Sequence, residues 1–269
     1  MPISRRSGSS ALATGVSELS GPAVDNPASD APSSLPPLTE TLKSSYFWQK
    51  IGPFALLALV MMVSASSSLY LLSAVRGFVN GESLWSKAQK DAIYYLSRYA
   101  DEGKARDLQQ YQKALQVPHG DARARANLYG DKTELQLVRQ GFEHGQNHPR
   151  DINALIWLLR TFRHFDLVKE PVAYWRQGDH YLLQLETLAH EIQTSYQSDL
   201  VTPFTITVWK REIDLINQGA TVVTTAFSDS LGHSSRTIVY LLMGLNGSLA
   251  LVLIGLWSWH TRRLIQQRQ

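Results

Sequence analysis

Two long stretches of the chain contain only uncharged and mostly apolar residues. They cover residues 51–75 and 237–259. At about 1.5 Å of rise per residue, a helix of either length crosses the roughly 30 Å hydrocarbon core of a bilayer. A cleavable signal peptide has a shorter apolar core than the first stretch, and fewer residues precede that core than precede residue 51 here. The pattern therefore predicts two transmembrane helices, 51–75 and 237–259.

The region between these stretches, 77–235, has the periodicity of amphipathic helices. Apolar side chains recur every three or four positions, first in the set Ile152, Leu155, Ile156, Leu159 and Phe162, and then in the set Leu182, Leu185, Leu188, Ile192 and Tyr196. No stretch alternates as a strand does. Helix breaks are expected at 118–120, at 129–131, between Gly145 and Pro149, and at Pro171. The predicted fold class is all-α, with two transmembrane helices flanking a helical bundle.

A heptad pattern precedes the second apolar stretch. Pro203 suits the first turn of a helix, with Thr202 as its N-cap, and one helix of about 55 residues is expected to run on through the membrane. The seam packs either inside the chain's own bundle or against a second copy, as a dimer or signalling seam. Its side chains are spaced by three and four positions in turn: Ile206, Trp209, Ile213, Ile216, Ala220, Val223 and Phe227.

Charge is distributed in a way that bears on membrane orientation. Region 77–235 holds 17 Lys and Arg against 19 Asp and Glu, so it is nearly neutral, and no nucleic-acid partner is expected. Arg262, Arg263 and Arg268 follow the second span, which by the positive-inside tendency predicts a cytoplasmic C-terminus. Two spans place the N-terminus on the same side. Region 77–235 is then an extracytoplasmic domain, residues 1–44 a disordered cytoplasmic tail, and residues 260–269 a cytoplasmic stub.

No catalytic constellation is visible in the sequence, so neither an enzyme nor a cofactor is expected. The chain has no cysteine, which excludes disulfides and thiolate chemistry. His144 and His148 are four positions apart, but Gly145 and Pro149 favour a turn between two helices over a metal site. In the second span, Gly244 and Ser248 form a small-x-x-x-small pair, and Asn246 favours a contact with the first span or with a second subunit.

A small-molecule site is one interpretation of the many aromatic and basic side chains in 77–235. Trp157 and Trp175 would line it, and Arg160 and Arg176 would hold an anionic group. Arg163 is another candidate for the second role. The alternative is an ordinary bundle core, with arginine side chains that extend from it to solvent.

Two segments resemble a known group of proteins. They are GESLWSKAQKDAIYYLSRYA at 81–100 and GFEHGQNHPRDINALIWLLRTF at 141–162. Both are similar to the N-terminal periplasmic sensor region of bacterial membrane signalling proteins. In those, a cytoplasmic diguanylate cyclase with a GGDEF domain, with or without an EAL domain, or a histidine kinase follows the second span. The resemblance covers roughly 77–263. The sequence departs from the pattern because it stops about ten residues after the second span, so either it is a fragment or its output works through another protein.

This resemblance implies a sensory input module in the bacterial inner membrane. Its partners would be membrane lipid, an unknown small-molecule or protein stimulus, and a second copy of the chain. Because no output motif is present, no catalytic residue carries over. The alternative function is that of a non-sensory assembly or adaptor protein of the inner membrane.

Overall fold

The computed structural model describes residues 44–130 and 133–266. The chain divides into two units, Met1–Phe47 and Trp48–Gln269, and all that follows concerns the second unit, apart from the start of the first helix. The predicted disordered tail, 1–44, lies outside the described residues except for Ser44, and so does the very end of the predicted stub.

Six helices make up the described part of the chain, and no strand occurs in it. They are α1 (Ser44–Glu102), α2 (Ala105–Tyr129), α3 (Leu135–His144), α4 (Pro149–Thr161), α5 (Asp166–Gln197) and α6 (Pro203–Gln266). The all-α prediction is confirmed. Two of these helices, α1 and α6, are long and apolar enough to cross a membrane.

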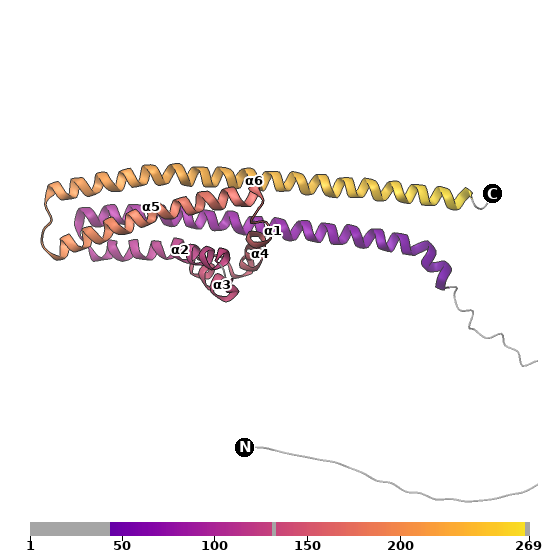
Figure 1. Ribbon diagram of the computed structural model, residues 1–269, viewed down its shortest axis with the longest axis horizontal. Coiled ribbons are helices and arrows are strands. Elements are labelled where there is room, and N and C mark those ends of the chain that lie inside the picture. Colours follow the sequence, from indigo (N-terminus) through magenta and orange to yellow (C-terminus); the bar gives the residue numbers. More distant parts are fainter. Residues whose placement is uncertain (1–43, 131–132, 267–269) are drawn as a thin grey trace, which may run out of the picture. The chain divides into compact units, whose positions relative to one another are not determined.

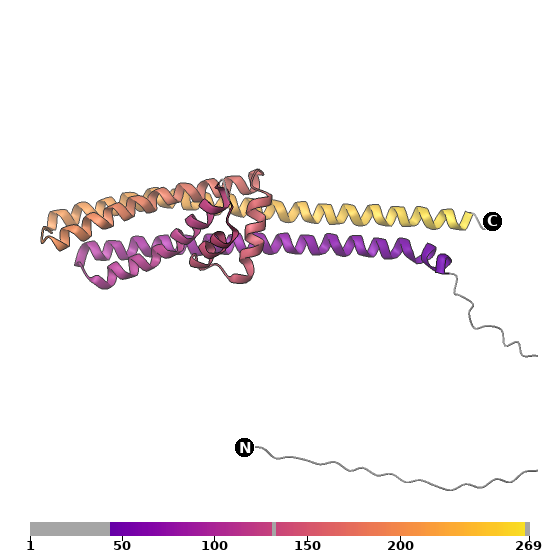
Figure 2. The ribbon, with the colours of Figure 1, turned by 60° about the horizontal axis from the view of Figure 1, so that its bottom comes forward.

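Four helices run side by side in alternating directions: α1, α2, α5 and then α6 (Figure 1). The short helices α3 and α4 form the connection between α2 and α5, and α4 lies across the long helices rather than along them (Figure 2). At the end away from the apolar segments, side-chain hydrogen bonds join three of these helices, α1, α5 and α6. Tyr196 of α5 donates to the carbonyl of Ala100 on α1 at 3.0 Å, and the Trp209 indole of α6 donates to Glu191 of α5 at 3.1 Å.

Several helix ends are where the sequence predicts them. α6 begins at Pro203, and the Thr205 amide donates to the Thr202 hydroxyl at 3.1 Å, so Thr202 is the N-cap. α3 ends at His144 and α4 begins at Pro149. Between them, the His148 ring accepts a hydrogen bond from the Arg150 amide at 3.2 Å, which caps α4.

Two expected breaks are wrong. Pro118 lies inside α2 and Pro171 lies inside α5, and both prolines are buried. Each interrupts one backbone hydrogen bond, but the helix continues because its apolar face remains packed in the core on both sides of the proline. Instead of a break at Pro171, the chain turns between α4, which ends at Thr161, and α5, which begins at Asp166, five residues before Pro171.

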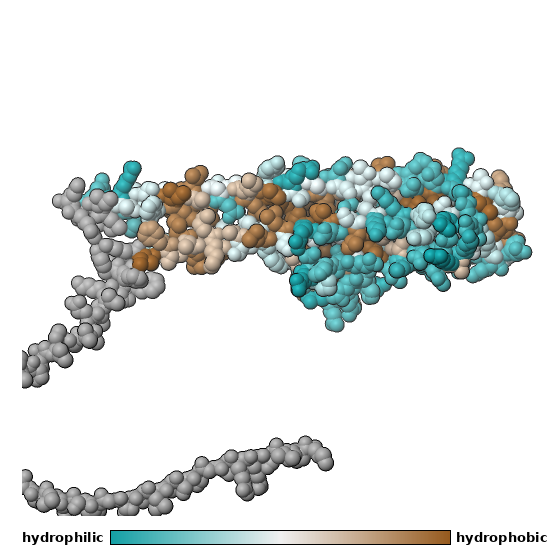
Figure 3. Space-filling view, turned by 180° about the vertical axis from the view of Figure 1, so that it is seen from behind, coloured by the Kyte–Doolittle hydropathy of each residue, from teal (hydrophilic) through white to brown (hydrophobic). Residues whose placement is uncertain are grey.

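The long helices α1 and α6 change character along their lengths. In 77–235 they contribute buried side chains to the bundle, whereas in the apolar segments most large side chains are exposed, among them Leu69 at 68% and Leu251 at 73%. Figure 3 shows hydrophobic residues gathered over the part formed by these segments alone, and mainly hydrophilic residues, with some hydrophobic ones among them, over the rest. Such a surface is unstable in water and stable in lipid.

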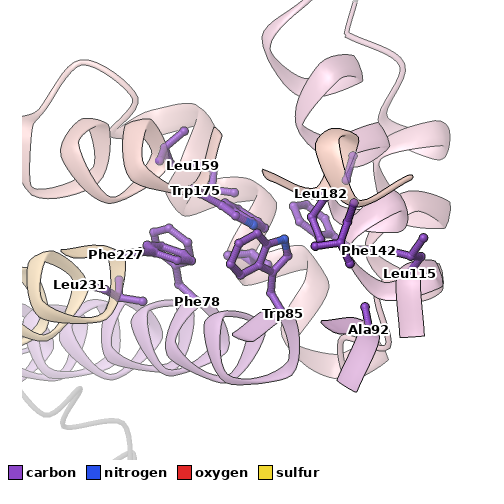
Figure 4. Packing of buried hydrophobic residues seen from close by; sticks show 14 of the residues in the cluster. Phe78, Trp85, Ala92, Leu115, Phe142, Leu159, Trp175, Leu182, Phe227 and Leu231 are labelled. Carbon is purple, nitrogen blue, oxygen red and sulfur yellow. The ribbon is translucent and has the colours of Figure 1, made fainter. Parts of the chain in front are cut away.

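The core of the bundle is built around large rings from different helices. Phe78 and Trp85 of α1 face Trp175 of α5 and Phe227 of α6 (Figure 4). The Trp175 and Phe227 rings stack with centroids 5.8 Å apart and planes 15° apart. Rings of this size contribute much of the buried apolar area, so their positions set the spacing of α1, α5 and α6.

Helices α2 and α3 approach closely because glycines face each other. A Cβ added to Gly120 of α2 would lie 2.4 Å from the amide nitrogen of Gly145 and 2.6 Å from the carbonyl oxygen of Gly141. These are backbone atoms, which cannot rotate away as the end of a side chain can. A residue larger than glycine at 120 would therefore push the two helices apart.

We expect Gly120→Ala to destabilise the fold by about 1–3 kcal/mol, through this overpacking. Thermal unfolding of the solubilised full chain, followed by circular dichroism, measures the change. Gly232→Ala in α6 is the matched control, since the nearest atom to its Cβ is the mobile end of Arg236 at 3.3 Å. The control should keep or raise the melting temperature, because alanine favours helix. Equal losses in both variants would contradict the close α2–α3 contact.

Candidate functional site

A cluster of polar side chains lies inside the bundle, next to the aromatic core. It consists of Asp121 and Arg125 of α2, Asn147 of the α3–α4 connection, and Asp179 of α5. Asp121 is 0% exposed, Arg125 3% and Asn147 7%. Charged residues are almost never buried to this degree unless they are paired. The cluster is therefore the feature of this fold that most needs a functional or structural reason.

The local fold places these groups together. Asp121 and Arg125 are one turn apart on α2 and face the same side. Asn147 is held in position by its own side chain, which donates to Asp121 Oδ1 at 3.0 Å and to the Phe142 carbonyl at 3.1 Å. Arg125 Nη2 contacts Asp179 Oδ2. Together these contacts link α2, α5 and the α3–α4 connection through one network.

Arg125 also binds the aromatic core. Its guanidinium carbon lies 4.0 Å from the centroid of the Trp175 ring, a cation–π contact in a desolvated site. Trp175 in turn stacks on Phe227 of α6. Arg125 is thus connected to α6 through the side chains of Trp175 and Phe227.

The network leaves several buried polar atoms without a hydrogen-bond partner among the described residues. They are Asp121 Oδ2, Asp179 Oδ1, the Nε and Nη1 of Arg125, and the indole nitrogens of Trp85 and Trp175. Each such atom costs free energy in a dry interior, and partly satisfied polar networks are much less stable than fully satisfied ones. The bundle therefore holds donors and acceptors that a repacked arrangement or a bound polar molecule would satisfy.

Burial also changes the acidity of the two carboxyl groups. Loss of hydration raises the pKa of Asp121 well above its usual value, against the opposing effects of the Arg125 charge and the Asn147 hydrogen bond. Loss of hydration likewise raises the pKa of Asp179, and Arg125 again opposes the shift. Both carboxyl groups therefore keep their protons to a higher pH than an exposed aspartate does, because burial outweighs the opposing charge of Arg125.

The four residues expected to bind a ligand do not come together. Trp157 and Arg160 line a recess of about 430 Å³ beside α3. Arg176 lines another recess of about 230 Å³, with Arg163. Trp175 is buried in the aromatic core at 1% exposure. No single pocket therefore contains the predicted set, and the part each residue plays in ligand binding remains a prediction.

The seven seam residues of α6 face the interior of this chain's own bundle. Ile206 and Val223 are partly buried, and the other five are buried: Trp209, Ile213, Ile216, Ala220 and Phe227. These contacts correspond to the intramolecular alternative. A second copy of the chain remains a prediction that the fold of one chain does not test.

Within the apolar segments, Asn246 of α6 contacts α1. Its side chain accepts from the Ser64 hydroxyl at 2.8 Å and donates to the Ser68 hydroxyl at 2.8 Å. Of the two partners open to Asn246 from the sequence, the structure provides the first span. Gly244, unlike Asn246, has no close neighbour among the described residues, because nothing lies within 4 Å of a Cβ built there.

Sequence reasoning missed the buried cluster, although a signal for it is present. Tyr111, Leu115 and Leu128 mark the inner face of α2, and continuing their helical spacing places Asp121 and Arg125 on that same face. A charged pair one turn apart on an apolar face indicates a buried network. Nothing in the sequence pattern points to Asn147 or Asp179 as the remaining members.

The two segments that carry the resemblance to sensor regions meet at Gly81 and Asn147. A Cβ on Gly81 would lie 2.9 Å from Asn147 Oδ1, and just before the first segment Arg76 forms an ion pair with Asp151 at 3.2 Å. No protein-family model matches the chain, and neither a curated protein nor a solved structure was found that matches it. The resemblance to sensor regions therefore stays a prediction.

The raised pKa of Asp121 makes the stability of the fold depend on pH. In the folded chain Asp121 keeps its proton to a higher pH than in the unfolded chain. Stability should therefore fall as pH rises from about 4, the ordinary value for aspartate, through the higher folded-state pKa. We expect Asp121→Asn to weaken this fall and to raise the melting temperature near neutral pH, as measured by thermal unfolding across pH.

Asp229→Asn is the control for this prediction, since Asp229 is exposed on α6. Its melting temperature should follow that of the native chain at every pH. If Asp121→Asn also followed the native curve in parallel, the buried carboxyl would not be the source of the pH dependence.

Proposed function

We propose that this chain is a transmembrane signal-input module. In this proposal the apolar segments of α1 and α6 cross the inner membrane of a bacterium, the helical domain 77–235 faces the periplasm, and both termini are cytoplasmic. A stimulus acting on the domain alters the packing of the bundle. The altered packing moves the transmembrane segments, and these act on a cytoplasmic output.

One observation carries the proposal: the helices that frame the bundle are the same helices that form the apolar segments. Neither α1 nor α6 is interrupted between the two regions. Hydrogen bonds join the two helices at successive levels, from Lys210–Asp101 at 2.8 Å, through Thr224–Gln89 at 2.6 Å and Ser228–Glu82 at 2.5 Å, to Ser64–Asn246 at 2.8 Å. Movement at one end is therefore transmitted to the other.

Aromatic residues at both ends of the apolar pair support the membrane position. Phe54 and Trp257 meet with centroids 5.8 Å apart, and Tyr70 meets Trp157 of α4 with centroids 5.0 Å apart. Phe54 and Tyr70 are separated by about 24 Å along a helix, at 1.5 Å per residue, a little less than the roughly 30 Å hydrocarbon core. Aromatic side chains are enriched at both interfaces of a bilayer. The arginines after Trp259 support a cytoplasmic C-terminus.

The buried cluster supports two alternative packings of the bundle. A rearrangement that satisfied the free atoms of Arg125 and Asp121 would move Arg125 relative to Trp175, and so shift α6. Tightly packed side chains favour discrete arrangements over gradual deformation. A stimulus that binds one of two such arrangements better than the other shifts their populations.

The phase of α6 between the bundle and the membrane should control the output. Each deleted residue rotates the following helix by about 100°. With a diguanylate cyclase domain joined after Gln269 as a reporter, we expect deletion of two residues between Phe227 and Thr237 to change basal activity most, because it places the opposite face of α6 toward α1. Deletion of four residues rotates the helix by only about 40° from its original phase and should restore much of the activity. Cyclic dinucleotide production measures both.

A steady loss of reporter activity with each residue removed, without regard to phase, would contradict transmission through α6. A separate control tests topology. Protease added outside spheroplasts should cleave within 77–235, and complete resistance of that domain would exclude the periplasmic position.

A further inference from the structure

The corner between α4 and α5 lies at the level where the apolar segments begin. Phe162 and Phe165, on either side of the corner, share an apolar groove with Leu71 of α1 and Leu242 of α6. Leu71 and Leu242 belong to the two predicted spans. α4 crosses the long helices at this level (Figure 2), and its Trp157 packs on Tyr70. In the proposed membrane position, this corner reaches the headgroup region and the upper hydrocarbon.

The groove itself is wholly apolar. It has a volume of about 180 Å³ and is lined by aliphatic and phenyl side chains from four helices and the corner, including Leu158, Val168 and Ile238. Phe165 is 59% exposed beside it. In water such a groove would be unfavourable, whereas at this depth a hydrocarbon chain fills it without the loss of any hydrogen bond.

A basic recess adjoins the groove on the side away from the apolar segments. It has a volume of about 230 Å³ and is lined by Arg163, His164, Lys169 and Arg176, with Tyr129 and Val172. Val168, which lines the groove, and Lys169, which lines the recess, are consecutive on α5. The Tyr129 hydroxyl donates to the Leu159 carbonyl at 3.4 Å, so the phenol lies against α4.

The cations of the recess form no ion pair with a carboxylate within the part of the chain that the structure describes, although the charge of Arg176 acts on Asp179, whose own ion pair is with Arg125. No carboxylate oxygen there lies within 4.0 Å of the side-chain nitrogens of Arg163, Lys169 or Arg176. Asp166 and Glu170 occur on the same stretch of chain but do not line the recess. Arg163 Nε donates to His164 Nε2 at 2.8 Å, which leaves its terminal nitrogens free to bind an anion.

We propose that this corner binds one anionic phospholipid of the adjacent leaflet. The phosphodiester lies between Arg163, Lys169 and Arg176, and an acyl chain lies in the groove beside Phe165. One arginine guanidinium can bind two phosphate oxygens in a fork geometry. Basic recesses beside membrane helices suit anionic headgroups. The apolar groove next to the cations favours a lipid over a soluble phosphate, because only a lipid occupies both. This inference relies on the proposed membrane crossing and not on the proposed signalling role.

Lipid retention by the full chain tests the site. The chain is reconstituted in nanodiscs of phosphatidylglycerol mixed with phosphatidylcholine, extracted gently, and the lipids that remain bound are counted by native mass spectrometry. We expect phosphatidylglycerol to be retained. The double variant Arg163→Gln and Arg176→Gln should lower that retention by about tenfold, since two charge-assisted contacts are lost. Phe165→Ser should lower retention of the same lipid by emptying the groove.

Two further variants test whether lipid retention depends on the cations of the recess or on the overall charge of the chain. Arg163→Lys with Arg176→Lys keeps both cations and should restore most of the retention. Arg123→Gln removes an exposed arginine of α2 that does not line the recess and should leave retention unchanged. Circular dichroism of each variant confirms that the helices remain.

The outcomes distinguish the proposals. Equal retention of phosphatidylcholine and phosphatidylglycerol would overturn the headgroup site alone, with the membrane position intact. A third outcome combines two results: millimolar inorganic phosphate releases the bound phosphatidylglycerol, and Phe165→Ser leaves its retention unchanged. Together they would show a site for soluble phosphate and would overturn the lipid proposal. Failure of the chain to enter nanodiscs at all would overturn both this inference and the proposed function.

Discussion

Two helices of this chain face two different environments along their lengths, and this constraint governs the rest of the structure. In the bundle, α1 places Phe78 and Trp85 in a packed core, and α6 does the same with Trp209 and Phe227. In the apolar segments the same helices leave Leu69 and Leu251 exposed. Because neither helix is interrupted, the face that each turns inward in the bundle fixes the face it turns toward its neighbour in the apolar pair. The Ser64–Asn246 hydrogen bond is one result.

The sequence predicted those features that depend on a long run of residues. The apolar segments, the continuous helix from Pro203 and its Thr202 cap all follow from composition or periodicity sustained over many positions. Breaks at Pro118 and Pro171 were expected and do not occur, because local helix propensity is outweighed by burial on both sides of each proline. Helix periodicity identified the inner face of α6 correctly but could not tell an intramolecular partner from a second copy.

The candidate site depends on contacts between distant segments, which no pattern in one segment encodes. Asp121 and Asn147 are 26 positions apart, and Arg125 and Asp179 are 54 apart. The glycines at 120, 141 and 145 permit the close α2–α3 contact, yet the sequence analysis interpreted 120 and 145 only as turn signals. The predicted ligand residues failed to converge for the same reason: Trp175 and Arg176 are neighbours in sequence, but helix geometry sends one to the core and the other to a surface recess.

Helix α5 carries parts of both the buried cluster and the basic recess. Asp179 belongs to the cluster, and Arg176, three positions earlier on the same helix, lines the recess. The proposed signalling role assumes that α1 and α6 pass unbroken from the bundle into lipid. Hydrogen–deuterium exchange of the full chain in nanodiscs measures this directly, amide by amide. The account predicts slow exchange without a gap through 70–85 on α1 and 226–242 on α6. A rapidly exchanging break in either segment would show that the bundle is hinged to the membrane helices and would contradict mechanical transmission between them.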